Sequence, residues 1–274
     1  MNIPRSISLP APARIFFLRV VSIFHQPENL MPVAHTNNPA DEFGFVEAVE
    51  IRRVSRQGVM RPLICQAEDG ACYFVKTFSS GGAWAQIAEW VSARIGRALG
   101  LPIPNYRQIN ISPELAGAWN LTGRRSVEAG VGFGSQEIAL ADECDAQQIK
   151  NLSPDDATRL LSFDWWIRNA DRTAKNPNLL WSRNENRHYL IDHEKAGDAG
   201  NGAIFWLNHI LAAHEPWMTD SIAINMRAIL PLVKKLPGEL PNEWTSATEG
   251  VAWFLAHLEQ SIANKPNRNW RPHE

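Results

Sequence analysis

The sequence predicts an α+β fold in which a β-rich first half and a mostly helical second half form two lobes with a cleft between them. Between residues 46 and 78, short apolar runs separated by polar turns follow the pattern of strands. Beyond residue 204, apolar residues recur at helical spacing, most clearly over residues 221–235 and 248–263. Strands gathered ahead of helices are typical of this fold class.

Size and composition exclude several classes of protein. The chain has 274 residues, of which 45% are apolar, so it can bury a sizeable core and is not intrinsically disordered. Its 27 basic and 29 acidic side chains nearly balance, which argues against non-specific nucleic-acid binding. Three scattered cysteines do not form a disulfide framework, so we expect a reducing, cytoplasmic location.

The chain divides into three parts. We interpret residues 1–40 as a flexible leader or as a mis-annotated start, with Met31 as the initiator. An apolar stretch inside this leader is too short to span a bilayer, so we expect no membrane association. Residues 41–138 and 139–274 would form the two lobes.

Strands are expected at the start of the first lobe. Residues 46–54 predict one strand, which is followed by a loop around Gly58. Residues 63–66 and 72–78 predict a hairpin, because Asp-Gly between two apolar runs is a strong turn signal. Residues 79–82 then end the sheet with two serines and two glycines.

A helix over residues 84–99 is expected next, because its apolar residues share one stripe. Gly100 and Pro102 end this helix, since glycine adopts the left-handed conformation and proline cannot continue a helix. Weaker strand patterns follow at residues 103–111 and 131–140.

The second lobe has a well-marked first helix. Ser153 is a good N-cap and Pro154 suits the first helical position, so a helix is expected to about residue 168. A polar loop and a second hairpin follow, with strands at residues 179–182 and 188–191.

Three polar side chains around this second hairpin point to a chemical function. Asp171 lies in the loop after the helix, Asn176 follows five residues later, and Asp192 comes where the hairpin ends. Carboxylate and amide oxygens are the ligands that hard cations prefer. The same order of residues serves phosphoryl transfer, in which the first Asp orients the acceptor hydroxyl. Asn176 and Asp192 would then hold Mg²⁺ on the nucleotide phosphates.

Lys76 and Glu89 supply candidate partners from the first lobe. On a strand, Lys76 would share one face with Phe74 and Phe78, so its ammonium would emerge from an apolar surface. We favour phosphate binding over an ordinary exposed lysine. Packing of the following helix on the sheet would pair Glu89 with Lys76, and a solvated helix face is the alternative for Glu89.

Two further places in the first lobe are expected to contact a nucleotide. The loop from Ser55 to Gly58 lies between two strands, where a phosphate-covering loop belongs, although it has one glycine rather than three. The alternating glycines between residues 130 and 134 predict a hinge between the lobes. Backbone groups of Glu137 and Ile138 would there be available to an adenine edge.

Asp164 and the histidines allow more than one interpretation. Asp164 falls on the apolar stripe of its helix, so it would need partners if it were buried. It either accepts hydrogen bonds from the backbone of the loop that carries Asp171, or lies at the edge of the stripe and reaches water. Two pairs of histidines, each five residues apart, favour structural or surface roles over zinc binding.

The residues that carry this chemistry resemble a known family. Residues 163–172, 176–181 and 190–193 are similar to the HipA-like kinases, and in particular to the shorter bacterial group called HipA family kinases. The similarity extends over about residues 46–210. More distantly, the Asp-Arg, Asn and Ile-Asp-His motifs resemble the phosphatidylinositol kinases.

The resemblance implies a protein-kinase-like, two-lobed fold with a nucleotide-binding lobe at 41–138 and a catalytic lobe at 139–274. Its implied functional residues are the catalytic Asp171, the Mg²⁺ ligands Asn176 and Asp192, and the phosphate-binding Lys76 with its partner Glu89. Two positions depart from the pattern: many relatives have histidine where Thr173 stands and glycine where Glu194 stands. Glu194 adds a negative charge beside the metal site.

We therefore expect an ATP- and Mg²⁺-dependent serine/threonine kinase whose partners are ATP and an unidentified protein acceptor. A pseudokinase-like module that binds ATP or acts as a scaffold stays open, because Thr173, Glu194 and the glycine-poor loop depart from an active kinase. A lipid or small-molecule kinase also stays open through the distant likeness to phosphatidylinositol kinases. The acceptor and the oligomeric state are not determined by the sequence.

Overall fold

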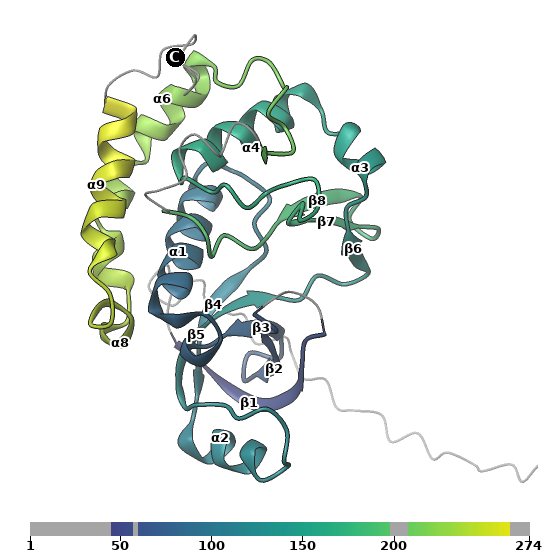
Figure 1. Ribbon diagram of the computed structural model, residues 1–274, viewed down its shortest axis with the longest axis vertical. Helices are drawn as coiled ribbons and strands as arrows, with labels where there is room; N and C mark the ends of the chain where they lie inside the picture. Colours follow the sequence, from purple (N-terminus) through teal and green to yellow (C-terminus); the bar gives the residue numbers. More distant parts are fainter. Residues whose placement is uncertain (1–44, 57–59, 198–207, 264–274) are drawn as a thin grey trace, which may run out of the picture. The chain divides into compact units, whose positions relative to one another are not determined.

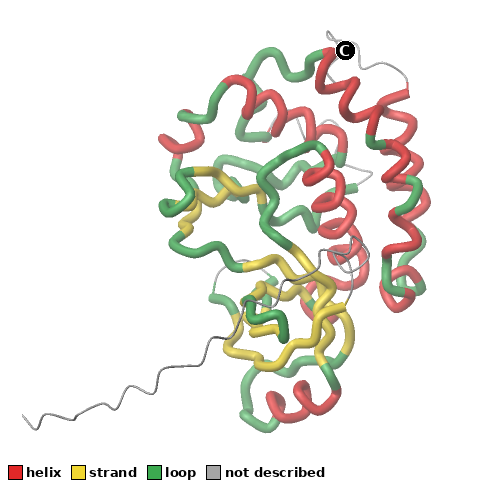
Figure 2. Tube along the Cα trace, turned by 180° about the vertical axis from the view of Figure 1, so that it is seen from behind, coloured by secondary structure: helices red, strands yellow, loops and turns green. Residues whose placement is uncertain are grey.

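A computed structural model of the chain describes residues 45–56, 60–197 and 208–263. All described residues belong to one compact unit of the chain, Asn38–Glu274. The leader expected at residues 1–40 lies outside the described residues, and so does Gly58. The described part combines a β-rich first portion with a helical second portion (Figure 1 and Figure 2).

The strands of the first portion close into a barrel. Their order around it is β1 (Phe45–Val54), β2 (Leu63–Ala67), β3 (Cys72–Lys76), β5 (Gly130–Gln136) and β4 (Tyr106–Ile111). Most neighbours are antiparallel, and parallel pairing of β1 with β4 closes the ring. The strands expected from the sequence are therefore present, with boundaries shifted by at most four residues.

The end of β3 differs from the expected strand. Tyr73 and Val75 are buried and belong to the barrel core, whereas Phe74 and Lys76 lie on the other face of the strand. Phe78 belongs to the following helix and is 46% exposed. The prediction that aromatic residues flank Lys76 on both sides of one strand face is therefore wrong for Phe78.

Helix α1 (Phe78–Ala98) begins earlier than the predicted residue 84. Hydrogen bonds between Thr77 and Ser80 hold its first turn, in the manner of a capping box. Gly82, at φ 72° and ψ 178°, then interrupts the helix. Regular helix follows and ends as predicted, with Gly100 in the left-handed region at φ 70°.

The alternating glycines lie in a strand of the barrel, which corrects the hinge expected there. A Cβ atom on Gly132 would lie 2.6 Å from the carbonyl oxygen of Lys76, and one on Gly134 would lie 2.4 Å from Cγ1 of Ile109. These glycines therefore permit the close approach of atoms from β3 and β4 to β5. The connection to the second portion is made by residues 137–140.

A small sheet opens the second portion. Its order is β6 (Ala141–Glu143), β7 (Leu179–Ser182) and β8 (Arg187–Leu190). The predicted hairpin between β7 and β8 is confirmed, and Asn186 in its turn has a positive φ of 50°. Strand β6 is too short to leave a pattern in the sequence.

Helix α4 (Pro154–Trp166) precedes this hairpin, and its predicted start is confirmed. The hydroxyl oxygen of Ser153 accepts a hydrogen bond from the backbone N–H of Asp156 at 3.1 Å. Two shorter helices were not expected from the sequence, namely α2 (Pro113–Asn120) after β4 and α3 (Ala146–Lys150) before α4.

The helical segments that follow residue 208 are α6 (Asp220–Ala228), α7 (Leu230–Val233), the 3-10 turn η2 (Leu236–Glu239), α8 (Asn242–Thr245) and α9 (Gly250–Ala263). The single helix predicted over 221–235 is broken at Ile229, because a proline in the first turn of α7 starts a new helix. Helix α9 runs beside α6 and α7 (Figure 1).

Two hydrophobic cores hold the described unit together. One fills the barrel, and the larger one joins α1 to α4 and to the C-terminal helices. Side chains of the larger core that are fully buried include Ile87, Ile95, Phe163, Trp166, Phe254 and Leu258. Helix α1 therefore packs against strand β5 of the barrel and also against the helices of the second half of the chain.

Among the described residues, no helix combines the length and apolar character that crossing a membrane requires.

Candidate active site

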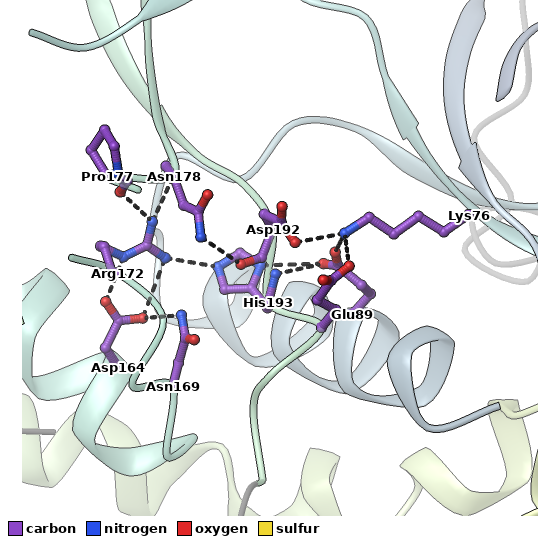
Figure 3. Close-up of polar contacts among 10 residues, drawn as sticks. Lys76, Glu89, Asp164, Asn169, Arg172, Pro177, Asn178, Asp192 and His193 are labelled. Carbon is purple, nitrogen blue, oxygen red and sulfur yellow. Dashed lines mark hydrogen bonds and ion pairs between the residues drawn. The ribbon is translucent and has the colours of Figure 1, made fainter. Parts of the chain in front are cut away.

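Lys76, at the end of β3, meets three carboxylates (Figure 3). Its Nζ atom lies 2.6 Å from Oε1 of Glu89, 2.6 Å from Oδ1 of Asp192 and 2.8 Å from Oε2 of Glu194. An ammonium group has three N–H donors, so all three are used. Burial alone would lower the pKa of Lys76, but the three carboxylates outweigh it and raise that pKa above its ordinary value.

Glu89 is held on both of its oxygens. It lies on α1 and is 3% exposed, with Oε1 on Lys76 and Oε2 accepting the backbone N–H of His193 at 3.0 Å. Burial would raise the pKa of Glu89, but the charge of Lys76 and the contact with His193 lower it to about 2. The carboxylate is therefore ionised and fixed between the two halves of the chain.

Asp192 comes two residues after β8 and has an unusual backbone conformation. Its φ of 61° is in the left-handed region, which aspartate tolerates better than most residues. The side-chain amide of Asn178 donates to the carbonyl oxygen of Asp192 at 3.4 Å, and the N–H of Ile191 donates to the carbonyl oxygen of Asn178 at 3.1 Å. These bonds set the direction in which Asp192 faces Lys76.

Asp171 and Asn176 lie together in the loop after α4. The Nδ2 group of Asn176 donates to Oδ2 of Asp171 at 3.0 Å, and paired backbone hydrogen bonds join Asn176 to Thr173. Burial and the negative charge of Asp192 raise the pKa of Asp171. The charge of Lys195 and hydrogen bonds from Asn178 and Asn176 lower it, but the net shift is upward.

A wholly buried ion pair between Asp164 and Arg172 supports the loop that carries Asp171. Asp164 and Arg172 are both 0% exposed, and Nε of Arg172 lies 2.5 Å from Oδ2 of Asp164. Asn169 donates to Asp164 at 3.1 Å, and Nε2 of His209 lies 3.0 Å from it. Asp164 is therefore buried and braces the loop, as one interpretation expected. The backbone N–H of Asn169 donates to its backbone carbonyl oxygen at 2.8 Å, while its carboxylate is bonded by the side chains of Asn169 and Arg172.

Arg172 and His193 extend this network to Glu89 (Figure 3). The guanidinium group of Arg172 donates to the carbonyl oxygens of Pro177 and Asn178 at 3.2 and 2.5 Å. Its Nη2 lies 3.3 Å from Nε2 of His193, whose backbone N–H is bonded to Glu89. A continuous polar path therefore runs from the support of the Asp171 loop to the partner of Lys76.

Sequence reasoning gave no role to Arg172, and for His193 it favoured a structural or surface role over zinc binding without indicating a partner. Both lie inside the motifs that carry the resemblance, directly after Asp171 and Asp192. A buried aspartate on the preceding helix needs a partner, and Arg172 is a cationic side chain only eight residues after Asp164, so their pairing could have been predicted. His193 has no such signal, because its partner Glu89 is 104 residues away in the chain.

The remaining predicted residues lie apart from this network. Ser55 is 3% exposed, and its backbone N–H donates to the carbonyl oxygen of Pro62 at 2.8 Å. The N–H of Glu137 donates to the carbonyl oxygen of Cys72 at 2.8 Å. The predicted adenine contact is thereby left to the carbonyl oxygen of Glu137 and to Ile138, which is partly buried.

Comparison with known proteins decides the family. A family model described as HipA-like kinase matches residues 48–271. The chain belongs to the HipA-like kinase family. The solved structure of a Helicobacter pylori proinflammatory kinase, CtkA, is similar in fold, with a TM-score of 0.50 and 11% identity, covering 79% of this chain and 92% of that chain. No curated protein matches the sequence.

Membership of the HipA-like kinases supports a phosphotransferase activity. The side chains of this HipA-like kinase also suit a hard cation. One oxygen each from Glu89, Asp192 and Glu194 lie within 4.8 Å of one another, and in this structure the ammonium group of Lys76 bonds all three carboxylates. Because Nδ2 of Asn176 faces Asp171, its amide oxygen is turned away from that carboxylate. Such oxygen donors fit Mg²⁺ by their chemistry.

Proposed function

We propose that the chain is an ATP- and Mg²⁺-dependent kinase that transfers the γ-phosphoryl group to the hydroxyl of a serine or threonine in a protein acceptor. The observation that supports this most strongly is the meeting of Lys76 with Glu89 and Asp192, from three separate elements. We propose further that the barrel and the helical portion act as the nucleotide-binding and catalytic lobes of a kinase, over residues 41–138 and 139–274.

Lys76 would bind the nucleotide phosphates through its ammonium group. Glu89, fixed by Lys76 and by the N–H of His193, would hold that ammonium in place. Phosphoryl transfer depends mainly on positioning and on neutralising charge, so a rigid lysine suits it. The loop that begins at Ser55 would cover the phosphates, and Glu137 and Ile138 would contact the adenine.

Asp171 would orient the acceptor hydroxyl and accept its proton. The hydrogen bond from Asn176 fixes one of its oxygens, and the other would face the acceptor hydroxyl. Its raised pKa makes it a better base than an ordinary aspartate.

Asn176 and Asp192 would hold Mg²⁺ through their side-chain oxygens. The metal would neutralise the negative charge that gathers on the phosphates as the phosphoryl group moves. The arrangement of the two residues in the loop and after the hairpin supports a shared ion, and Asn178 links the two segments.

The test is phosphoryl transfer from radiolabelled Mg·ATP, followed by intact mass and by label on a panel of protein, lipid and small-alcohol acceptors. We expect wild-type protein to transfer label to protein, and Asp171→Asn to reduce the rate by about 10³-fold. Asp155→Asn is the matched control, because Asp155 is an exposed carboxylate at the start of α4. Transfer that Asp171→Asn leaves unchanged, or label on lipid alone, would contradict the proposal.

A pseudokinase-like module that binds ATP or acts as a scaffold is the second candidate. The scaffold is favoured by the full occupation of Lys76 by three carboxylates, one of which is Glu194. In that case Mg·ATP would leave the melting temperature of the protein unchanged, and no turnover or transfer would follow with any acceptor.

A further inference from the structure

Glu194 uses a donor of Lys76 that a nucleotide would need. Its Oε2 lies 2.8 Å from Nζ of Lys76, and the residue is 8% exposed. The other two donors of the ammonium group point to Glu89 and Asp192. A phosphate oxygen can therefore bond Lys76 only after one of the three carboxylates has moved away.

Glu194 is the one of the three carboxylates that the proposed function leaves without a role. Glu89 is fixed by a second hydrogen bond from the backbone N–H of His193. Asn178 holds the backbone carbonyl oxygen of Asp192, and the proposed function assigns the carboxylate of Asp192 to Mg²⁺. Among the described residues, the carboxylate of Glu194 has Lys76 as its hydrogen-bond partner. A movement of Glu194 therefore breaks one contact and removes no proposed ligand.

The negative charge of Glu194 also opposes the binding of nucleotide phosphates at Lys76. The three carboxylates face a single ammonium group, and one oxygen of each lies within 4.8 Å of the others. A nucleotide brings further negative charge to this place, and like charges at such distances repel each other in a partly buried site. Neutral residues at position 194 would reduce that repulsion.

We infer that Glu194 occupies the place of a phosphate oxygen on Lys76 and thereby weakens the binding of nucleotide phosphates, so that it sets the nucleotide affinity of the enzyme. The inference rests on the proposed function, because it takes Lys76 as the phosphate-binding residue. Glu194 acts through Lys76 and is a positioning residue.

Calorimetric titration of the full chain with Mg²⁺ and a non-hydrolysable ATP analogue tests the inference. We expect Glu194→Gln to bind the analogue about tenfold more tightly than wild type, the effect of removing one competing charged hydrogen bond. Adenosine, which lacks phosphates, should bind both proteins equally. Glu143→Gln, which neutralises an exposed carboxylate on β6, is the matched control and should bind like wild type.

Equal or weaker binding of the analogue by Glu194→Gln would overturn the inference, and weaker binding would make Glu194 a metal ligand instead. A parallel gain for adenosine would also overturn it, because the effect would then not pass through the phosphates. Glu194→Ala is the second variant, and circular dichroism confirms that each variant is folded. If neither wild type nor the variants bind the analogue, the proposed function fails and the inference fails with it, whereas equal binding overturns the inference alone.

Discussion

Asp164 and Arg172 are both fully buried and form a charge pair that would be costly to separate. Burial would raise the pKa of Asp164, but Arg172 and His209 outweigh it and hold that pKa well below its ordinary range. A buried pair that is satisfied on both sides stabilises a loop, whereas a buried charge that has lost its partner is strongly destabilising. The loop that carries Asp171 therefore depends on Asp164.

We predict that Asp164→Asn lowers the free energy of unfolding by about 3–5 kcal/mol, because it leaves Arg172 buried without a countercharge. Urea denaturation of the variant and of wild type measures this difference. The exposed control Asp155→Asn should change stability by less than about 0.5 kcal/mol. A loss below about 1 kcal/mol for Asp164→Asn would show that the pair does not brace the loop.

At the residue scale the sequence names the residues to which we assign chemistry and two that support them, Glu89 and Asp164, but not the long-range contacts of the others. Asp171, Asn176 and Asp192 follow from a short, ordered spacing, and Lys76 from its place among apolar neighbours. The contact between His193 and Glu89 spans 104 residues, and nothing local to either residue indicates the other. The role of Glu194 on Lys76 is likewise a product of folding, since 118 residues separate the two.

The packing of strand β5 between its two neighbours leaves no room for a side chain at two of its glycines, Gly132 and Gly134. The strand lies between β3 and β4 in the barrel, and its glycines leave room for their atoms. A Cβ atom on Gly132 would lie 2.6 Å from the carbonyl oxygen of Lys76 and 2.7 Å from Cγ1 of Val75. The backbone oxygen cannot rotate away as a side chain could, so β3 would have to shift.

We predict that Gly132→Ala destabilises the protein by about 1–3 kcal/mol, the usual cost of an extra methyl group in a closed space. Gly117→Ala is the matched control, because Gly117 lies within α2 and a Cβ atom there meets nothing within 4 Å. Alanine favours a helix over glycine, so this control should gain about 0.5–1 kcal/mol. Thermal unfolding measures the melting temperature, which should fall for Gly132→Ala and rise for Gly117→Ala. An unchanged melting temperature of Gly132→Ala would contradict the close approach of the Lys76 carbonyl oxygen to Gly132.

Elements were predictable from the sequence where local chemistry marks their ends. Ser153 with Pro154 marks the start of α4, and the Asp-Gly turn marks the hairpin of β2 and β3. The start of α1 was misjudged, because Gly82 looks like a boundary although the helix begins before it. The short elements α2, α3 and β6 have too few residues for a hydrophobic period to be visible.

The described unit is held together largely through α1. Arg94 on this helix forms two hydrogen bonds of 2.7 Å with the carboxylate of Glu239 in η2, and the indole of Trp90 donates to the same carboxylate at 3.3 Å. Near its start, the indole of Trp84 donates to the carbonyl oxygen of Ala196 at 3.2 Å. These contacts fix α1, and therefore Glu89, relative to the segment that carries Asp192.

Over the residues that the structure describes, the order of a β-rich part before a mostly helical part was predictable from the sequence, but the packing of α1 was not. The apolar stripe of α1 is visible in the sequence, yet it fits the barrel and the helical portion equally well. Only the contacts show that α1 shares its core with Phe163, Trp166 and Leu258.

We predict that the stability of the protein falls steeply in acid. Glu89, at a pKa of about 2, and Asp164 both have lower pKa values in the folded than in the unfolded chain, so the unfolded chain binds their protons first. Their stabilisation is complete above about pH 5 and is lost as the pH falls toward 2. The pKa values of Glu194 and Asp171 are raised in the folded chain. These two groups therefore favour unfolding as the pH rises and they lose their protons.

Urea midpoints at pH 7, 5 and 3.5 measure this dependence. The urea midpoint should fall less between pH 5 and pH 3.5 in Glu89→Gln than in wild type, because the glutamine side chain takes up no proton in this range. A midpoint that stays constant down to pH 3.5 would show that these carboxylates are not stabilised by their partners.

The central claim is that Lys76, Asn176 and Asp192 lie around one nucleotide and one metal ion. A crystal structure of the full chain with a non-hydrolysable ATP analogue and Mn²⁺, whose anomalous scattering locates the metal, tests it most directly. We predict a metal peak bonded to side-chain oxygens of Asn176 and Asp192, and a phosphate oxygen within hydrogen-bond distance of Nζ of Lys76. A metal peak away from both residues, or a nucleotide bound away from Lys76, would contradict the claim.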